Sequence, residues 1–167
     1  MADLDNKENY LDIMVESLRK KEKVLEELIE KCDAQAEVIA EGEYHTVNWD
    51  QFNVLIADKE VLINRLNDLD DGFEALYDRV GDEIKKNKDR YAPQIKEIQA
   101  LIKTVTDQGV TIKTKEERNR ANLEQVLRPV KKEIRTTKRS MNVINNYYNV
   151  MNGGGANSSS GWVDKKK

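Results

Sequence analysis

The chain has 167 residues, of which 38% are hydrophobic, 35% charged and only 6% aromatic, and its formal net charge is -3 at pH 7. This composition supplies too little apolar material for a compact β-sandwich or α/β domain, whereas a thin helical bundle buries only one stripe of each helix. Only two prolines and eight glycines interrupt the chain, which favours long helices.

Residues 6–41 place apolar side chains at alternating three- and four-residue steps, the spacing of a helix that packs along one stripe. Lys21 and Gln35 interrupt this stripe, and Gly42 ends it. Its members are Leu11, Met14, Leu18, Leu25, Leu28, Cys32 and Ile39. We expect one long bundle-forming helix here.

The second stripe is the most regular in the sequence, and only Lys59 interrupts it. Its members are Phe52, Leu55, Leu62, Leu66, Leu69, Phe73, Leu76 and Val80. Asn48 or Asp50 can cap this helix by accepting a hydrogen bond from a free backbone N–H. A short connection is expected around residues 85–92, before Pro93, because proline suits the first turn of a helix.

The third segment begins at Ile95, turns polar at Glu116 and Asn119, and resumes as an apolar stripe from Leu123. As a single helix it would span about 85 Å, against about 50 Å for the first helix. We therefore expect either a break near residues 107–111 or a C-terminal half that extends beyond the first helix. Pro129 removes a backbone hydrogen bond and should bend the helix.

These stripes predict an all-α fold. The expected architecture is an antiparallel bundle of three long helices with coiled-coil-like packing, an extended C-terminal helix and a disordered tail. The bundle domain should comprise residues 1–151. Residues 152–167 are rich in glycine and serine and end in lysines, which predicts the disordered tail.

Catalytic and metal-binding motifs are missing from the sequence. His45 is the only histidine, whereas di-metal bundles need paired Glu-x-x-His elements. Cys32 is the only cysteine and lies on an apolar stripe, where a thiol is usually inert. No glycine-rich loop follows a strand pattern. We therefore expect no enzyme activity, no cofactor and no bound metal.

The cellular compartment can also be inferred. A single cysteine forms no intrachain disulfide, which fits a reducing compartment. The first residues are acidic rather than basic and apolar, and no apolar run is long enough to cross a bilayer. We expect a cytoplasmic protein without membrane insertion.

Charge is distributed unevenly along the chain. Residues up to Ile84 hold 9 Lys+Arg against 23 Asp+Glu, and those from Lys85 onward hold 19 against 8. Either acidic and basic helices pack side by side, or the basic half meets an acidic partner surface. Nucleic acid is not an expected partner, because the acidic half would repel phosphate. The basic residues that border the late apolar stripe are Arg128, Lys131, Lys132, Arg135, Lys138 and Arg139.

A family resemblance adds to this pattern. The run Phe52-x-x-Leu55-x-x-x-Lys59-x-x-Leu62-Ile63-x-x-Leu66-x-x-Leu69-Asp70, a late Asn119-x-x-Asn122 and a Tyr147-Tyr148 pair before a polar, lysine-ended tail resemble the FlgN/FliT-like flagellar export chaperones, in particular FlgN-like proteins of clostridial type. Asp71-Gly72 departs from the arginine-rich helix continuation of many relatives, and Pro129 is not part of the pattern.

The resemblance implies a cytoplasmic chaperone of type III flagellar export. Such a protein binds the helical termini of hook-associated (filament-junction) or cap subunits and prevents their aggregation before secretion; components of the export apparatus are a second class of expected partner. In that family the C-terminal helix binds substrate. The matching positions here are Leu127, Val130, Ile134, Met141, Ile144 and Tyr148.

Two further residues near the C-terminus are candidates for partner contacts. Tyr147 and Met151 extend the set as adaptable contacts for a partner, or else belong to the core at the end of the bundle.

The alternative function is a structural coiled-coil protein that self-associates through its C-terminal helix. A homodimer stays open in both cases.

Overall fold

The computed structural model describes residues 2–40, 42–131 and 145–150, with side chains from residue 9 onward. It contains three long helices, α1 (Ala2–Ile39), α2 (Trp49–Lys86) and α3 (Ala92–Leu127), followed by a 3₁₀ turn, η1 (Arg128–Val130). Residues 145–150 are also helical. No strand occurs in these ranges, so the all-α prediction is confirmed.

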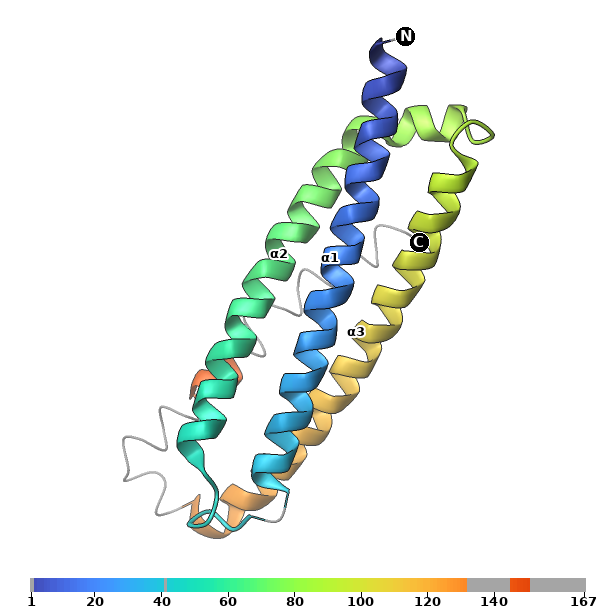
Figure 1. Ribbon diagram of the computed structural model, residues 1–167. Coiled ribbons are helices and arrows are strands. Elements are labelled where there is room, and N and C mark those ends of the chain that lie inside the picture. The colour runs from blue at the N-terminus through green and yellow to red at the C-terminus, as the bar shows by residue number, and fades with distance from the viewer. Residues whose placement is uncertain (1, 41, 132–144, 151–167) are drawn as a thin grey trace.

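The middle helix of the bundle is α1 (Figure 1). It packs along its length against both α2 and α3, whereas direct packing between α2 and α3 is sparse. The chain runs down α1, up α2 and down α3 in the view of Figure 1, so the α1–α2 loop and the end of α3 lie at the same, lower end. We use upper and lower in this sense below.

The helix boundaries follow the expected signals. Asn48 caps α2, because its side-chain oxygen accepts a hydrogen bond from the backbone N–H of Gln51 at 3.1 Å. The connection between α2 and α3 falls at residues 87–91, and Pro93 occupies the first turn of α3.

The structure tests one of the two expectations for the third segment. The helix is continuous through Gly109, so there is no break near residues 107–111. α3 itself ends at Leu127 and is followed by the 3₁₀ turn η1 at Pro129, and much of the expected C-terminal half, residues 132–144, lies outside the described residues. A proline lacks the N–H that would continue the helix, which explains this end. With 36 residues, α3 closely matches the 38 residues of α1.

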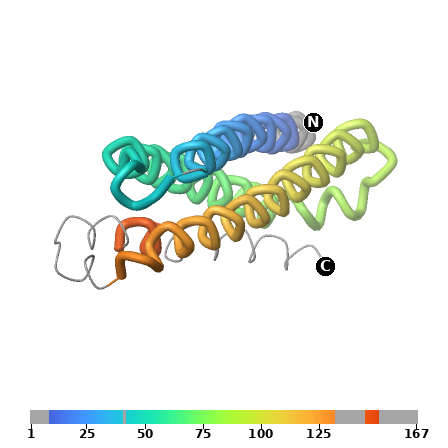
Figure 2. Tube along the Cα trace, turned by 90° about the horizontal axis from the view of Figure 1, so that it is seen from below, coloured from blue at the N-terminus to red at the C-terminus, as the bar shows by residue number. Residues whose placement is uncertain are grey.

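Buried apolar side chains gather in two separate cores. The upper core consists of Leu11, Met14, Val15, Leu18, Val24, Leu25, Leu28, Leu62, Ile63, Phe73, Val80, Tyr91, Ile98 and Val105. The lower core consists of Ile39, Val47, Phe52, Ile56, Leu123, Leu127 and Tyr147. In Figure 2, seen from below, residues 145–150 lie beside the end of α3, where Tyr147 joins the lower core.

The upper core gives a first test of the packing. Leu18 is 1% exposed, whereas Leu66 is half-buried at the edge of the same core, although both lie on regular apolar stripes. Changing Leu18 to Ala should lower the free energy of unfolding by about 3 to 5 kcal/mol, and Leu66→Ala by about 2 kcal/mol or less. Urea unfolding of both variants measures this difference. Equal losses would show that the two leucines are equally buried.

Candidate functional site

Between the two cores, each long helix contributes a polar side chain to one buried layer: Gln35 from α1, Lys59 from α2 and Glu116 from α3. Lys59 is 1% exposed and Gln35 is fully buried. The Lys59 ammonium pairs with the Glu116 carboxylate and donates a hydrogen bond to Gln35 Oε1 at 2.8 Å. These residues are among those that interrupt the apolar stripes in the sequence.

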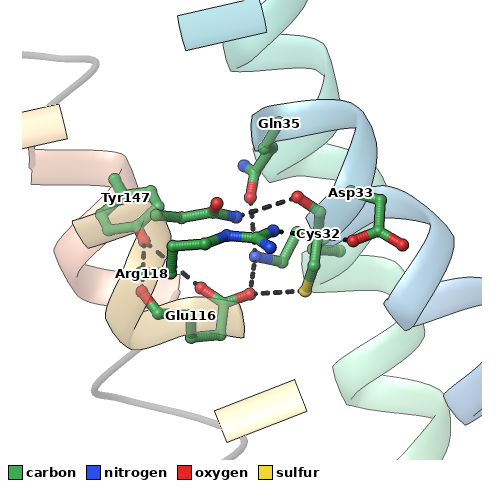
Figure 3. Close-up of polar contacts among 8 residues, drawn as sticks. Cys32, Asp33, Gln35, Glu116, Arg118 and Tyr147 are labelled. Carbon is green, nitrogen blue, oxygen red and sulfur yellow. Dashed lines mark hydrogen bonds and ion pairs between the residues drawn. The ribbon is translucent and has the colours of Figure 1, made fainter. Parts of the chain in front are cut away.

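Glu116 is the centre of this polar layer (Figure 3). Besides pairing with Lys59, its carboxylate accepts hydrogen bonds from Cys32 Sγ at 2.9 Å and from the Tyr147 hydroxyl at 3.3 Å. Asn119, one turn further along α3, donates to the Cys32 carbonyl at 2.9 Å. The layer therefore connects all three long helices to residues 145–150.

Burial alters the acid–base properties of the groups around Glu116. Loss of solvent raises the pKa of the Cys32 thiol to about 12, with a further contribution from the Glu116 charge. Burial and the same carboxylate raise the pKa of the Tyr147 hydroxyl. Both groups are therefore neutral near pH 7 and act as hydrogen-bond donors to Glu116. A protonated, fully buried thiol is a poor nucleophile.

The polar layer is not fully satisfied. Gln35 Nε2 and Asn119 Oδ1 are buried and have no hydrogen-bond partner among the described residues. Each such atom costs roughly 1 to 3 kcal/mol of desolvation. A buried ion pair also gains little net stability, because desolvation offsets much of the Coulombic attraction. The layer is therefore a weak source of stability compared with the apolar cores on either side.

A second buried ion pair lies within the upper core. Lys21 of α1 donates to Asp70 of α2 at 2.6 Å, and both side chains are at most 10% exposed. Burial raises the pKa of the Asp70 carboxyl even though Lys21 acts in the opposite direction. The attraction to Lys21 thus does not fully offset the desolvation of the carboxylate.

The structure describes four of the eight predicted partner-binding residues and places them together at the lower end. Leu127 and Tyr147 are buried in the lower core, and Val130 and Tyr148 pack against it half-buried. In this structure Tyr147 therefore belongs to the core at the end of the bundle. The other four, Ile134, Met141, Ile144 and Met151, lie outside the described residues.

Aromatic contacts anchor residues 145–150 to the α1–α2 loop region. The Tyr147 ring stacks on Phe52 with centroids 5.8 Å apart, and Phe52 in turn contacts Trp49 edge to face at 5.8 Å. Trp49 Nε1 donates to the Tyr44 carbonyl at 2.8 Å. On the other side, the Arg120 guanidinium lies 5.5 Å from the Tyr148 ring. Sequence reasoning missed this chain of contacts, although aromatic residues are concentrated at 44–52 and 147–148.

α3 is not a basic helix that would balance the charge asymmetry. The α3 helix has six Lys+Arg and five Asp+Glu, so it is nearly neutral. It pairs with α1 through Arg19–Glu97 and Lys115–Asp33. Most of the basic excess lies after α3, and its described members Arg128 and Lys131 are exposed. An acidic partner surface stays a prediction.

The described part of the chain lacks two other kinds of feature. It contains no group of three or more His, Cys, Asp or Glu side chains placed to hold a metal ion. None of its helices combines the length and the apolar character that crossing a membrane requires.

Comparison with known proteins agrees with this architecture. The FlgN protein family matches residues 10–157. The chain belongs to the FlgN family. Its general role is that of a flagellar export chaperone, and the resemblance seen in the sequence is confirmed. The match includes nearly all of α1, then α2, α3 and residues 145–150. No curated protein and no solved structure matches the chain.

The buried thiol gives a test of the polar layer. Cys32 should react with a thiol reagent at pH 8 roughly a hundredfold more slowly in the folded protein than in denaturant, because burial both shields it and suppresses its thiolate. A Val110→Cys variant supplies the control, since Val110 is 63% exposed on α3 and its cysteine should react at once. Rapid modification of Cys32 in the native protein would contradict the buried position.

The Lys59–Glu116 pair can be tested by a double-mutant cycle. Lys59→Met leaves a buried carboxylate without its cation, and Glu116→Gln leaves a buried ammonium without its anion, so each should cost about 3 to 5 kcal/mol. The double variant buries neither charge and should cost less than either single change. Chemical unfolding of the four proteins measures the coupling. Additive losses would mean that the two charges do not interact.

Proposed function

We propose that this protein is a cytoplasmic chaperone that binds the helical termini of hook-associated or cap subunits and prevents their aggregation before export. The observation that carries this proposal is the FlgN family match, which includes both the bundle and the C-terminal segment. Export subunits with exposed amphipathic helices need a surface that covers their apolar faces until secretion, because such faces drive aggregation.

The proposed client surface is the apolar stripe that follows α3. Of its described members, Val130 and Tyr148 are half-buried at the edge of the lower core, whereas Leu127 and Tyr147 are buried within it. Ile134, Met141, Ile144 and Met151 continue the stripe in the sequence. An amphipathic client helix that packs on this stripe would gain affinity from apolar burial, with anchors at helical spacing.

Charge supports an acidic edge on the client. Arg128 and Lys131 are exposed at the lower end, and four more basic residues follow them before residue 140. Such a basic border steers an acidic partner and suppresses binding of basic ones. The proposed complex should therefore weaken as salt is added.

The client surface is tested by placing charges on its stripe. Ile134→Asp together with Ile144→Asp should weaken binding of a purified hook-associated subunit by roughly a hundredfold or more, since each buried charge removes an apolar anchor. Calorimetric titration measures this loss. The matched control is Val54→Asp with Val61→Asp, which adds the same charges at positions of α2 that are 58% and 59% exposed. It should bind normally.

Circular dichroism and thermal unfolding of the free variants complete this experiment. The proposal requires that the Ile134→Asp/Ile144→Asp protein stay helical and melt cooperatively. If the substitutions unfold it, the stripe is core and the client site lies elsewhere. If they only dissociate a homodimer, and the native chain binds no flagellar subunit, the structural coiled-coil alternative is correct.

A further inference from the structure

The polar layer falls at the point where every long helix passes from one core to the other. On α1 it lies between Leu28 of the upper core and Ile39 of the lower core. On α2 it lies between Leu62 and Ile56, where Lys59 is the buried residue of the intervening turn. The two cores are therefore separated on each helix.

On α3 a longer stretch of residues separates the two cores. Val105 is the last buried residue of the upper core and Leu123 the first of the lower core. Asn119 is the fully buried residue between them, and the half-buried Glu116 lies one turn before it. Each long helix thus contributes a buried or half-buried polar group at this level.

The Lys21–Asp70 pair shows that a buried ion pair alone does not divide a core. Leu18 and Val24, on either side of Lys21, belong to the same upper core. Gln108 donates to the Glu22 carbonyl at 3.2 Å, so α3 passes this level near the buried, apolar Val105. Apolar contact through α3 is therefore continuous at this level.

Cooperative unfolding needs favourable contact between the parts that unfold together. Across the polar layer that contact consists largely of a desolvated ion pair and hydrogen bonds, and two of its polar atoms have no partner among the described residues. Val150, half-buried against both cores, is an apolar bridge, and it belongs to the C-terminal segment. We infer that the polar layer divides the bundle into two cooperative units, so that the lower unit opens while the upper unit stays folded.

The lower unit consists of the end of α1, the α1–α2 loop, the start of α2, the end of α3 from Asn119, and residues 145–150. The lower unit holds the described members of the proposed client surface. A client helix could therefore bind there while the upper unit stays folded. Only this statement about client binding rests on the proposed function. The division itself concerns the free protein. An exchange measurement without client therefore distinguishes a failure of the division from a failure of the proposed function.

Native-state hydrogen exchange of the full chain in low urea tests the division. Amides of the lower unit, such as those of Phe52 and Leu123, should exchange at least about tenfold faster than those of Leu25 and Val105 in the upper unit. The change should occur as a step at the polar layer. One common rate for all core amides, or a smooth gradient from the helix ends, would overturn the inference.

A variant with an apolar layer between the two cores tests whether the polar layer causes the division. Lys59→Met with Glu116→Leu makes the layer more apolar, so the step in exchange rate should shrink to about twofold or less. The matched control, Lys21→Met with Asp70→Leu, replaces the other buried pair and should leave the step unchanged. A step that survives the first variant, or vanishes in the second, would assign the division to something else. Should the first variant not fold, the wild-type profile decides.

Discussion

The buried pair between Lys59 and Glu116 is the constraint around which the rest of the structure is arranged. Lys59 is 1% exposed, so its ammonium must find acceptors within the protein, and Glu116 and Gln35 supply them. Acceptors from two other helices reach it only in one alignment of α1, α2 and α3. The pair contributes little net stability, but an alignment that separates the charges would leave each buried and uncompensated, at a cost of several kcal/mol.

The same carboxylate determines where the C-terminal segment lies. Glu116 accepts the Tyr147 hydroxyl, and the Tyr147 ring stacks on Phe52 of α2. Residues 145–150 thus contact α2 and α3, whose direct packing is sparse elsewhere. A tyrosine suits this position because its ring belongs to the apolar lower core while its hydroxyl reaches the polar layer. The segment is anchored at the boundary between the two kinds of environment.

Much of this fold is predictable from the sequence, because amphipathic spacing reports helices directly. The three long helices, the Asn48 cap and the proline at the start of α3 are confirmed. The break expected near residues 107–111 was wrong, since α3 is continuous through Gly109. The polar interruptions at Gln35, Lys59 and Glu116 were visible, but their mutual pairing depends on helix rotation and register, which spacing within one helix does not specify. The contact of Tyr147 with Phe52 joins residues 95 positions apart and has no local signal.

The division into two cores suits the function proposed above, in which a client binds at one end of the bundle. A bundle with one continuous apolar core would unfold as a whole, and rearranging any part of its surface would then compete with global stability. Here the extended upper core holds the helices together, while the smaller lower core contains loop and C-terminal residues that pack through a few aromatic groups. The charged layer between them also opposes a shift of one helix along another. Such a shift of register would bury Lys59 among leucines, without a partner for its charge. The division thus preserves the alignment of the helices while one end of the bundle remains free to repack.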